Sequence, residues 1–190
     1  MNINYLEICT QRHHKATLAL VEKLVGVPSE LVETCPVIAK KGTELHMVMP
    51  GITGLTIDYD FVNPYIMNGA FSLELKMKFL NLIETGNKIE AGHRLLGIFS
   101  ELSNDTKEFL RENLKIIVKN SSTCKEVTKI LNQESKIQFN WDLHKLLSNS
   151  DMAFERWRYI YESSDDSTWF AGYSEIQKAL DLRIADLKSR

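Results

Sequence analysis

Hydrophobic residues between Pro64 and Ile83 cover almost every face of a helix. They are Ile66, Met67, Ala70, Phe71, Leu73, Leu75, Met77, Phe79, Leu80, Leu82 and Ile83. A helix that is apolar on all sides belongs at the centre of a bundle, because each face needs a packing partner. The pattern therefore predicts a central helix over residues 64–83. Glu74 and Lys78 stand four positions apart in the order that favours pairing, and we expect a structural ion pair rather than a catalytic couple.

Apolar residues on one side of the segment 5–25 predict a first helix, which ends before Pro28. A turn follows the central helix, and a helix that opens on His93 is expected to pack back against it. Both segments would supply walls for the central helix. We read the adjacent His13 and His14 as a solvated basic spot on the first helix rather than a metal site, because neighbouring helical side chains point apart.

Three helix starts downstream are marked by a capping residue followed three positions later by Glu or Gln. The pairs are Asp105 and Glu108, Thr123 and Glu126, and Ser174 and Gln177. In each pair the first side chain can satisfy free amides of the first helical turn. With the neighbouring apolar patterns, these signals predict helices over residues 105–119, 123–132, 141–162 and 174–188. We expect a break in the third at residues 148–150 and a loop over 163–168.

Helical periodicity fails between Pro28 and Tyr59. Short apolar runs there are interrupted by Pro36, Gly42, Pro50, Gly51 and Gly54. The runs can form a β-hairpin that turns across residues 50–54. The predicted fold is thus mainly α: an up-and-down helical bundle in a single domain over residues 1–190, with a small irregular or β-hairpin insertion near residues 28–59.

Two stretches of this chain together resemble one known helical family. Residues 71–80, Phe-Ser-Leu-Glu-Leu-Lys-Met-Lys-Phe-Leu, precede Gly86 and then residues 92–96, Gly-His-Arg-Leu-Leu. This order resembles the central helix pair of HEPN domains, the higher eukaryote and prokaryote nucleotide-binding family. Residues 154–162, Phe-Glu-Arg-Trp-Arg-Tyr-Ile-Tyr-Glu, are similar to a late helix of some bacterial members. The resemblance implies a homodimer and a role in bacterial antiviral defence or a toxin–antitoxin system, with a protein partner encoded nearby.

The chain departs from the motif of HEPN ribonucleases, in which an arginine is followed after four to six residues by a histidine. No such histidine follows the arginines at positions 12, 94, 111, 156 or 158. The nearest relaxed versions place Lys40 or Lys41 before His46, and Lys88 before His93. The departure favours a non-catalytic or degenerate module.

Arg156, Arg158 and Tyr161 form a cluster with Tyr159, in which Arg156 stands three positions before Tyr159 and Arg158 three positions before Tyr161. Such a cluster can stack on a nucleotide and hold its phosphate, although the aromatic residues can equally serve packing. If catalysis persists, the candidate catalytic set of a metal-independent endoribonuclease is Arg156, Arg158, Tyr161 and His144. His93 and Arg94, at a helix start, are the candidate anion or cofactor contacts, or they shape the turn.

Composition and charge limit the remaining classes of function. The chain has 190 residues, a formal net charge of -2 and a pI near 6.2, so nucleic-acid binding would need a local patch or a dimer groove. Three widely spaced cysteines without neighbouring histidines fit a reducing cytoplasm and argue against zinc. No membrane span, leader pattern, phosphate-binding loop or dinucleotide fingerprint occurs, so we expect a cytoplasmic protein without a cofactor.

Three functions from different classes follow. The first is a HEPN-like module that binds RNA, nucleotide or a partner protein without catalysis. The alternative is an atypical ribonuclease that uses the set above. The second alternative is a helical scaffold that docks another protein through a strand edge in the segment 28–59.

Overall fold

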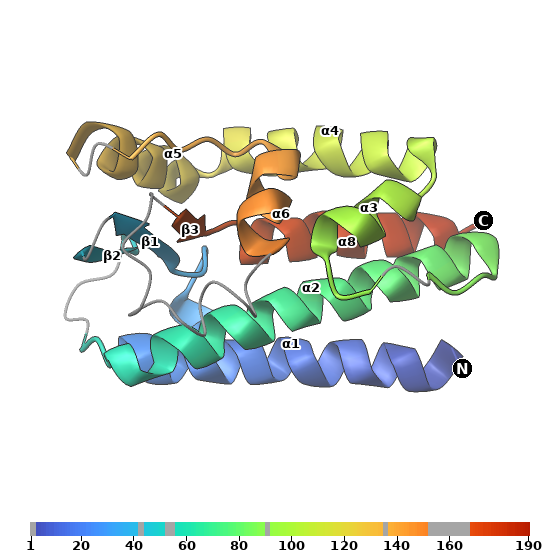
Figure 1. Ribbon diagram of the computed structural model, residues 1–190, viewed down its shortest axis with the longest axis horizontal. Coiled ribbons are helices and arrows are strands. Elements are labelled where there is room, and N and C mark those ends of the chain that lie inside the picture. Colours follow the sequence, from blue (N-terminus) through green and yellow to red (C-terminus); the bar gives the residue numbers. More distant parts are fainter. Residues whose placement is uncertain (1–2, 42–43, 52–55, 90–91, 135–136, 152–167) are drawn as a thin grey trace.

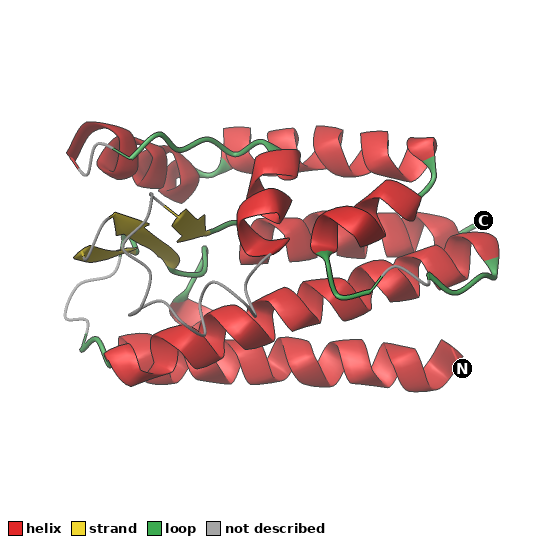
Figure 2. Ribbon diagram, in the orientation of Figure 1, coloured by secondary structure: helices red, strands yellow, loops and turns green. Residues whose placement is uncertain are grey.

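The helices of the protein stack in layers. The computed structural model describes residues 3–41, 44–51, 56–89, 92–134, 137–151 and 168–190. Helix α1 (Ile3–Val25) packs along α2 (Val62–Thr85), α2 packs on α8 (Tyr173–Lys188), and α8 packs on α4 (Asn104–Asn120) (Figure 1). Helices α1 and α4 therefore lie on opposite sides of the bundle. The predicted mainly α architecture is confirmed, as the colouring by secondary structure shows (Figure 2).

Helix α2 is the central helix that the apolar pattern predicts. Its buried residues include Phe79, Leu80, Met77 and Glu74, which at 100° per residue span more than half of the helix circumference. The helix ends where Gly86 adopts a left-handed conformation, with φ of 72°. Gly69 lets the helix approach the segment 168–173, because a Cβ atom there would lie only 2.9 Å from the ring of Phe170 and 3.5 Å from that of Tyr173.

Among the described residues, three shorter helices accompany these four. They are α3 (Leu95–Glu101), α5 (Ser122–Lys129) with a π-helical turn after it (Ile130–Glu134), and α6 (Leu143–Asp151). Two 3-10 turns, Ser29–Leu31 and Tyr59–Phe61, flank the predicted insertion. The expected break at residues 148–150 is wrong, because α6 continues through them: Ser150 Oγ donates to the Leu146 carbonyl, which lies 2.9 Å away.

The helix starts lie slightly earlier than the capping pairs predict. Ser103, not Asp105, caps α4 by accepting a hydrogen bond from the Thr106 amide. Ser121, not Thr123, caps α5 in the same way. Helix α8 begins after Gly172, whose φ is 75°, and no side chain caps it. Cap-prone residues stand side by side at these sites, so the local pattern identifies the region but not the residue.

A three-stranded antiparallel sheet sits at one end of the bundle. Strand β1 (Val37–Lys41) pairs with β2 (Glu44–Val48) on one side and with β3 (Thr168–Phe170) on the other. The predicted β insertion near residues 28–59 is present, but β2 pairs with the preceding strand β1 rather than with a strand that follows residues 50–54. The expected loop over 163–168 ends in β3, and its earlier part lies outside the described residues. Tyr65 of α2 contacts Phe170 of β3 edge to face, which ties the sheet to the core.

Charged and polar groups in the interior are tied to one another. Glu84 on α2 accepts hydrogen bonds from Ser103, Thr106 and Arg183. This arrangement links α2, α4 and α8 through one carboxylate. No helix in the described part of the chain is long and apolar enough to cross a bilayer.

Candidate functional site

Helix α4 has one buried face and a row of basic side chains beside it. Leu110 and Leu114 point into the bundle. The basic residues follow at four-residue spacing: Lys107, Arg111, Lys115 and Lys119. Residues four apart are neighbours on a helix, so these cations form a continuous strip along the axis, about 6 Å from one to the next.

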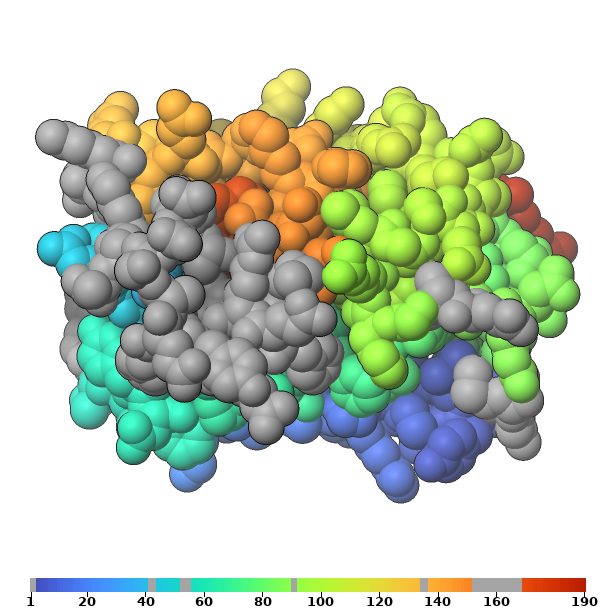
Figure 3. Space-filling model, in the orientation of Figure 1, coloured from blue at the N-terminus to red at the C-terminus, as the bar shows by residue number. Residues whose placement is uncertain are grey.

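A groove runs beside the C-terminal half of α4. It encloses about 400 Å³, and its walls come from α4 and from the segment that leads into α6. The lining residues are Arg111, Leu114, Lys115, Val118, Lys119, Asn140, Trp141, Asp142 and Leu143. The surfaces of α4 and α6 border one another on the face shown in Figure 3. The groove therefore has an apolar floor and a cationic rim.

Trp141 forms a fixed aromatic wall of the groove. Its Nε1 donates to Thr128 Oγ1 at 2.8 Å and to the Cys124 carbonyl at 3.3 Å. Phe139 contacts the indole edge to face, with ring centroids 5.1 Å apart. These contacts hold the half-buried indole in one orientation, so it presents a preformed surface to a ligand.

The cations on the rim differ in how they are paired. Arg111 lies 3.3 Å from Glu108 and 5.4 Å above the ring of Phe99. Lys115 and Lys119 are exposed, and within the described part of the chain neither forms an ion pair. Asp142 is the acidic residue of the lining, and one of its oxygens accepts a hydrogen bond from the Lys145 amide. The groove thus offers an excess of positive charge to an anion.

Of the four catalytic residues that the sequence predicts, only His144 lies in the described part of the chain. Arg156, Arg158 and Tyr161 lie outside the described residues. His144 is exposed on α6, directly after Leu143 of the groove. Asp142 caps α6 by accepting a hydrogen bond from the Lys145 amide, rather than orienting His144.

The predicted pair of Glu74 and Lys78 is confirmed, and the fold adds His93 to it. Lys78 Nζ lies 2.8 Å from Glu74 Oε1 and also donates to the Gly92 carbonyl. His93 Nδ1 lies 3.0 and 3.2 Å from the two oxygens of the same carboxylate. The Glu74 side chain is 2% exposed and that of His93 is 77% exposed, so a buried carboxylate orients a solvent-facing imidazole.

Arg94 immediately precedes α3 and is exposed. The Leu96 amide at this helix start donates to Asp151 Oδ1 at 2.8 Å. A protein carboxylate therefore already occupies the amide where an anion was expected. The anion-binding role of His93 and Arg94 stays a prediction.

The prediction that His13 and His14 form a solvated basic spot is wrong. His13 Nδ1 lies 3.1 Å from Asn68 Oδ1, and His14 Nδ1 lies 2.9 Å from Tyr173 Oη. Both histidines are half-buried, because His13 contacts the ring of Phe71 on α2 and His14 stacks on the ring of Tyr173 on α8. In the described ranges, no group of three or more metal-ligating side chains comes together.

No known protein-family model matches this chain, and no curated protein or solved structure is significantly similar to it. The groove beside α4 was not predicted from the sequence. The row of basic residues on α4 can be recognised in the sequence, because a series of basic residues at four-residue spacing is a local pattern. Trp141 gave no such signal, because only the packing of α5 against the following segment brings it to the groove.

Proposed function

We propose that this protein is a HEPN-like RNA-binding module without ribonuclease activity. The groove beside α4 supports this proposal most directly, because cations, a fixed tryptophan ring and apolar side chains line it together. Proteins that bind single strands combine a cationic track for the phosphates with aromatic rings on which bases stack. Neither feature depends on base identity, so binding is expected to be tolerant of sequence.

The charge balance favours RNA bound at one local surface. A net charge of -2 gives no long-range attraction for polyanions, so affinity has to come from Arg111, Lys115 and Lys119. Three phosphate contacts to a single strand correspond to a slope of about -2 in a plot of log affinity against log salt. An acidic peptide could satisfy the cations but would leave the indole without a flat partner.

Fluorescence anisotropy with a labelled single-stranded RNA of about twelve nucleotides tests the proposal. The double variant Lys115→Gln, Lys119→Gln should bind about ten- to thirtyfold more weakly at 0.1 M salt and lose about 1.4 units of salt slope. Lys15→Gln is the matched control, because Lys15 is an exposed lysine on α1, across the bundle from α4. Equal loss in the control, or tighter binding of an acidic peptide than of RNA, would contradict the proposal.

A second candidate function is RNA cleavage, which the pair of Glu74 and His93 favours. A carboxylate bound to Nδ1 leaves Nε2 of an exposed imidazole free to take up or release a proton. RNA incubated with the protein and a chelator, then separated by gel electrophoresis, distinguishes the candidates. If His93→Asn loses cleavage but retains RNA binding, the protein is a ribonuclease and the non-catalytic proposal is wrong. Arg158→Ala and His144→Ala test the set predicted from the sequence.

The biological setting and the oligomeric state are also proposals. The resemblance to HEPN domains supports a role in defence or in a toxin–antitoxin system, with a partner encoded nearby. Helix α2 is enclosed by α1 and α8, so a homodimer would have to use other apolar residues, such as the exposed Tyr5 and Ile8 on α1. Sedimentation at micromolar concentration tests the dimer, and a monomer would refute it.

A further inference from the structure

A second cavity lies between α1, α2 and α8, away from the groove beside α4. It encloses about 160 Å³ and is lined by Glu7, Thr10, Gln11, His14, Lys76, Phe79, Asp181 and Ile184. A cavity of about 150 Å³ is large enough for benzene, so this one has room for about six to eight non-hydrogen atoms. It is too small for a nucleotide and suits a much smaller molecule.

Lys76 is the cation of this cavity. Its ammonium lies 2.6 Å from Asp181 Oδ1, and the two side chains are 10% and 63% exposed. Burial lowers the pKa of Lys76, while the hydrogen bond to Asp181 and its charge act in the opposite direction. An ammonium group carries three donors, so two remain for a ligand after the contact with Asp181.

His14 supplies a further donor. Burial lowers the pKa of His14, and the nearby charge of Lys76 lowers it further, so the ring is neutral near pH 7. Its Nδ1 faces Tyr173 Oη, and Tyr173 Oη in turn lies 3.0 Å from Ser72 Oγ. If the tyrosine donates to Nδ1, the imidazole proton sits on Nε2 and is available to a ligand.

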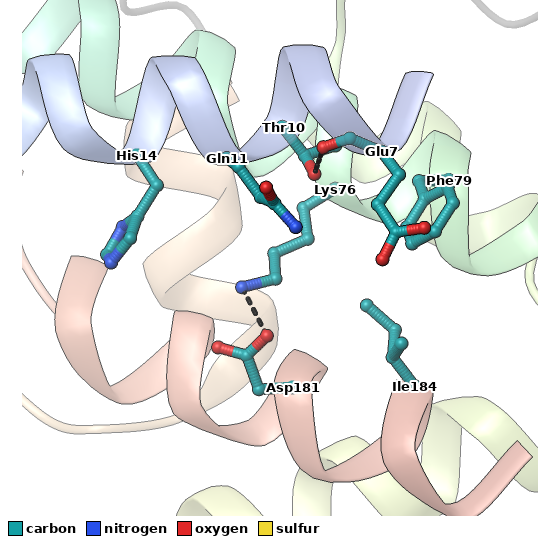
Figure 4. Close-up of a pocket in the computed structure, with 8 residues that line it drawn as sticks. All are labelled: Glu7, Thr10, Gln11, His14, Lys76, Phe79, Asp181 and Ile184. Carbon is teal, nitrogen blue, oxygen red and sulfur yellow. Dashed lines mark hydrogen bonds and ion pairs between the residues drawn. The ribbon is translucent and has the colours of Figure 1, made fainter. Parts of the chain in front are cut away.

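Acceptors lie toward the other end of the cavity. One oxygen of Glu7 accepts from Lys188 at 2.8 Å, and a carboxylate oxygen has capacity for more. The amide of Gln11 has no side-chain hydrogen bond among the described residues. Figure 4 shows His14 and Glu7 at opposite ends of the cavity, with Gln11 and Lys76 between them and Ile184 beneath.

From this arrangement we propose that the cavity binds a small zwitterion of the class of short α-amino acids. The ligand carboxylate lies on the donors of Lys76, His14 and Gln11, and its ammonium group lies toward Glu7. Phe79 and Ile184 accommodate a short apolar side chain. A ligand with a single charge would contact the polar groups at only one end of the cavity, which disfavours a simple acid or a simple amine.

Isothermal titration calorimetry with glycine, alanine, serine and valine tests this inference. At least one should bind with a Kd of about 10 μM to 1 mM, within the range open to ligands of this size. Propionate and ethylamine, which each carry one of the two charges of alanine, should bind at least tenfold more weakly. Lys76→Met should reduce the affinity at least tenfold, and Gln11→Ala about threefold or more.

Lys15→Gln is again the control, because Lys15 is exposed on α1 and does not line the cavity. Circular dichroism confirms that each variant is folded, and Gln11→Ala, an exposed position, keeps the test valid if Lys76→Met does not fold. The inference is overturned if no amino acid binds saturably below about 20 mM. It also fails if propionate or ethylamine binds as tightly as alanine, or if binding survives unchanged in Lys76→Met or Gln11→Ala. RNA binding by the groove is independent of all these outcomes.

Discussion

Charged side chains occupy two different surroundings in this protein. Around α2 and α8 they are buried and bound to one another, as in the contacts of Arg183 with Glu84 and of Lys78 with Glu74. Along α4, Lys115 and Lys119 stand in solvent beside a groove. Buried charges need their partners, because an unpaired charge in the interior is costly. Exposed lysines cost little to keep unpaired, so they remain available for a ligand.

Arg183→Ala should produce the largest loss of stability, because it leaves Glu84 without its cation between three helices. Arg183 is 5% exposed and also donates to Thr106. Removal of one partner of a buried pair costs about 3–5 kcal/mol. Urea denaturation measures the change. Arg190→Ala is the matched control, because Arg183 and Arg190 both contact Asp186 but Arg190 is 64% exposed. Its loss should cost less than about 0.5 kcal/mol.

Glu74→Gln should have the next largest effect. The substitution preserves the volume but removes the charge that holds Lys78 and His93. We expect a loss of about 1.5–3 kcal/mol, the usual range for a hydrogen bond to a charged group. Thermal denaturation of the variant beside Glu108→Gln, which loses only an exposed pair with Arg111, gives the comparison. Equal effects would show that burial of Glu74 adds nothing.

Glu175→Gln should make stability less dependent on pH. Burial raises the pKa of Glu175 above that of the same residue in the unfolded chain. The folded protein therefore holds a proton that the unfolded chain releases, and stability falls as pH rises from about 4.3 through the folded-state pKa. The glutamine variant lacks this loss, so its free energy of unfolding relative to that of the wild-type protein should rise as the pH is raised. Urea denaturation of both proteins across this pH range measures the free energies of unfolding. A difference in free energy that stays constant with pH would contradict a raised pKa of Glu175.

Loss of the exposed cations should have the smallest effect on stability. The double variant Lys115→Gln, Lys119→Gln should change the free energy of unfolding by less than about 0.5 kcal/mol, although RNA affinity falls. The two measurements on one variant separate binding from folding. A stability loss comparable with that of Glu74→Gln would mean that these lysines serve the fold.

Local patterns predict the elements of this protein best where one chain segment contains the whole signal. The apolar run of α2 and the spacing of Glu74 and Lys78 both lie within a single helix, and the structure bears them out. Helix starts are shifted by one or two residues, because Ser103 and Asp105 are both suitable caps and only tertiary packing chooses between them. Strand β3 was missed, because its three residues are a strand only by pairing with β1.

The sequence by itself determined that α2 would be central and that α4 would carry a row of cations, since both follow from periodicity within one helix. Only the tertiary structure decided what each charge faces. It places Trp141 and Lys115 in the lining of one groove, His93 beside Glu74, and Asp181 against Lys76. These partners are separated by many residues along the chain, and the packing of α1, α2, α4 and α8 brings them together. The sites therefore depend on distances that no local pattern encodes.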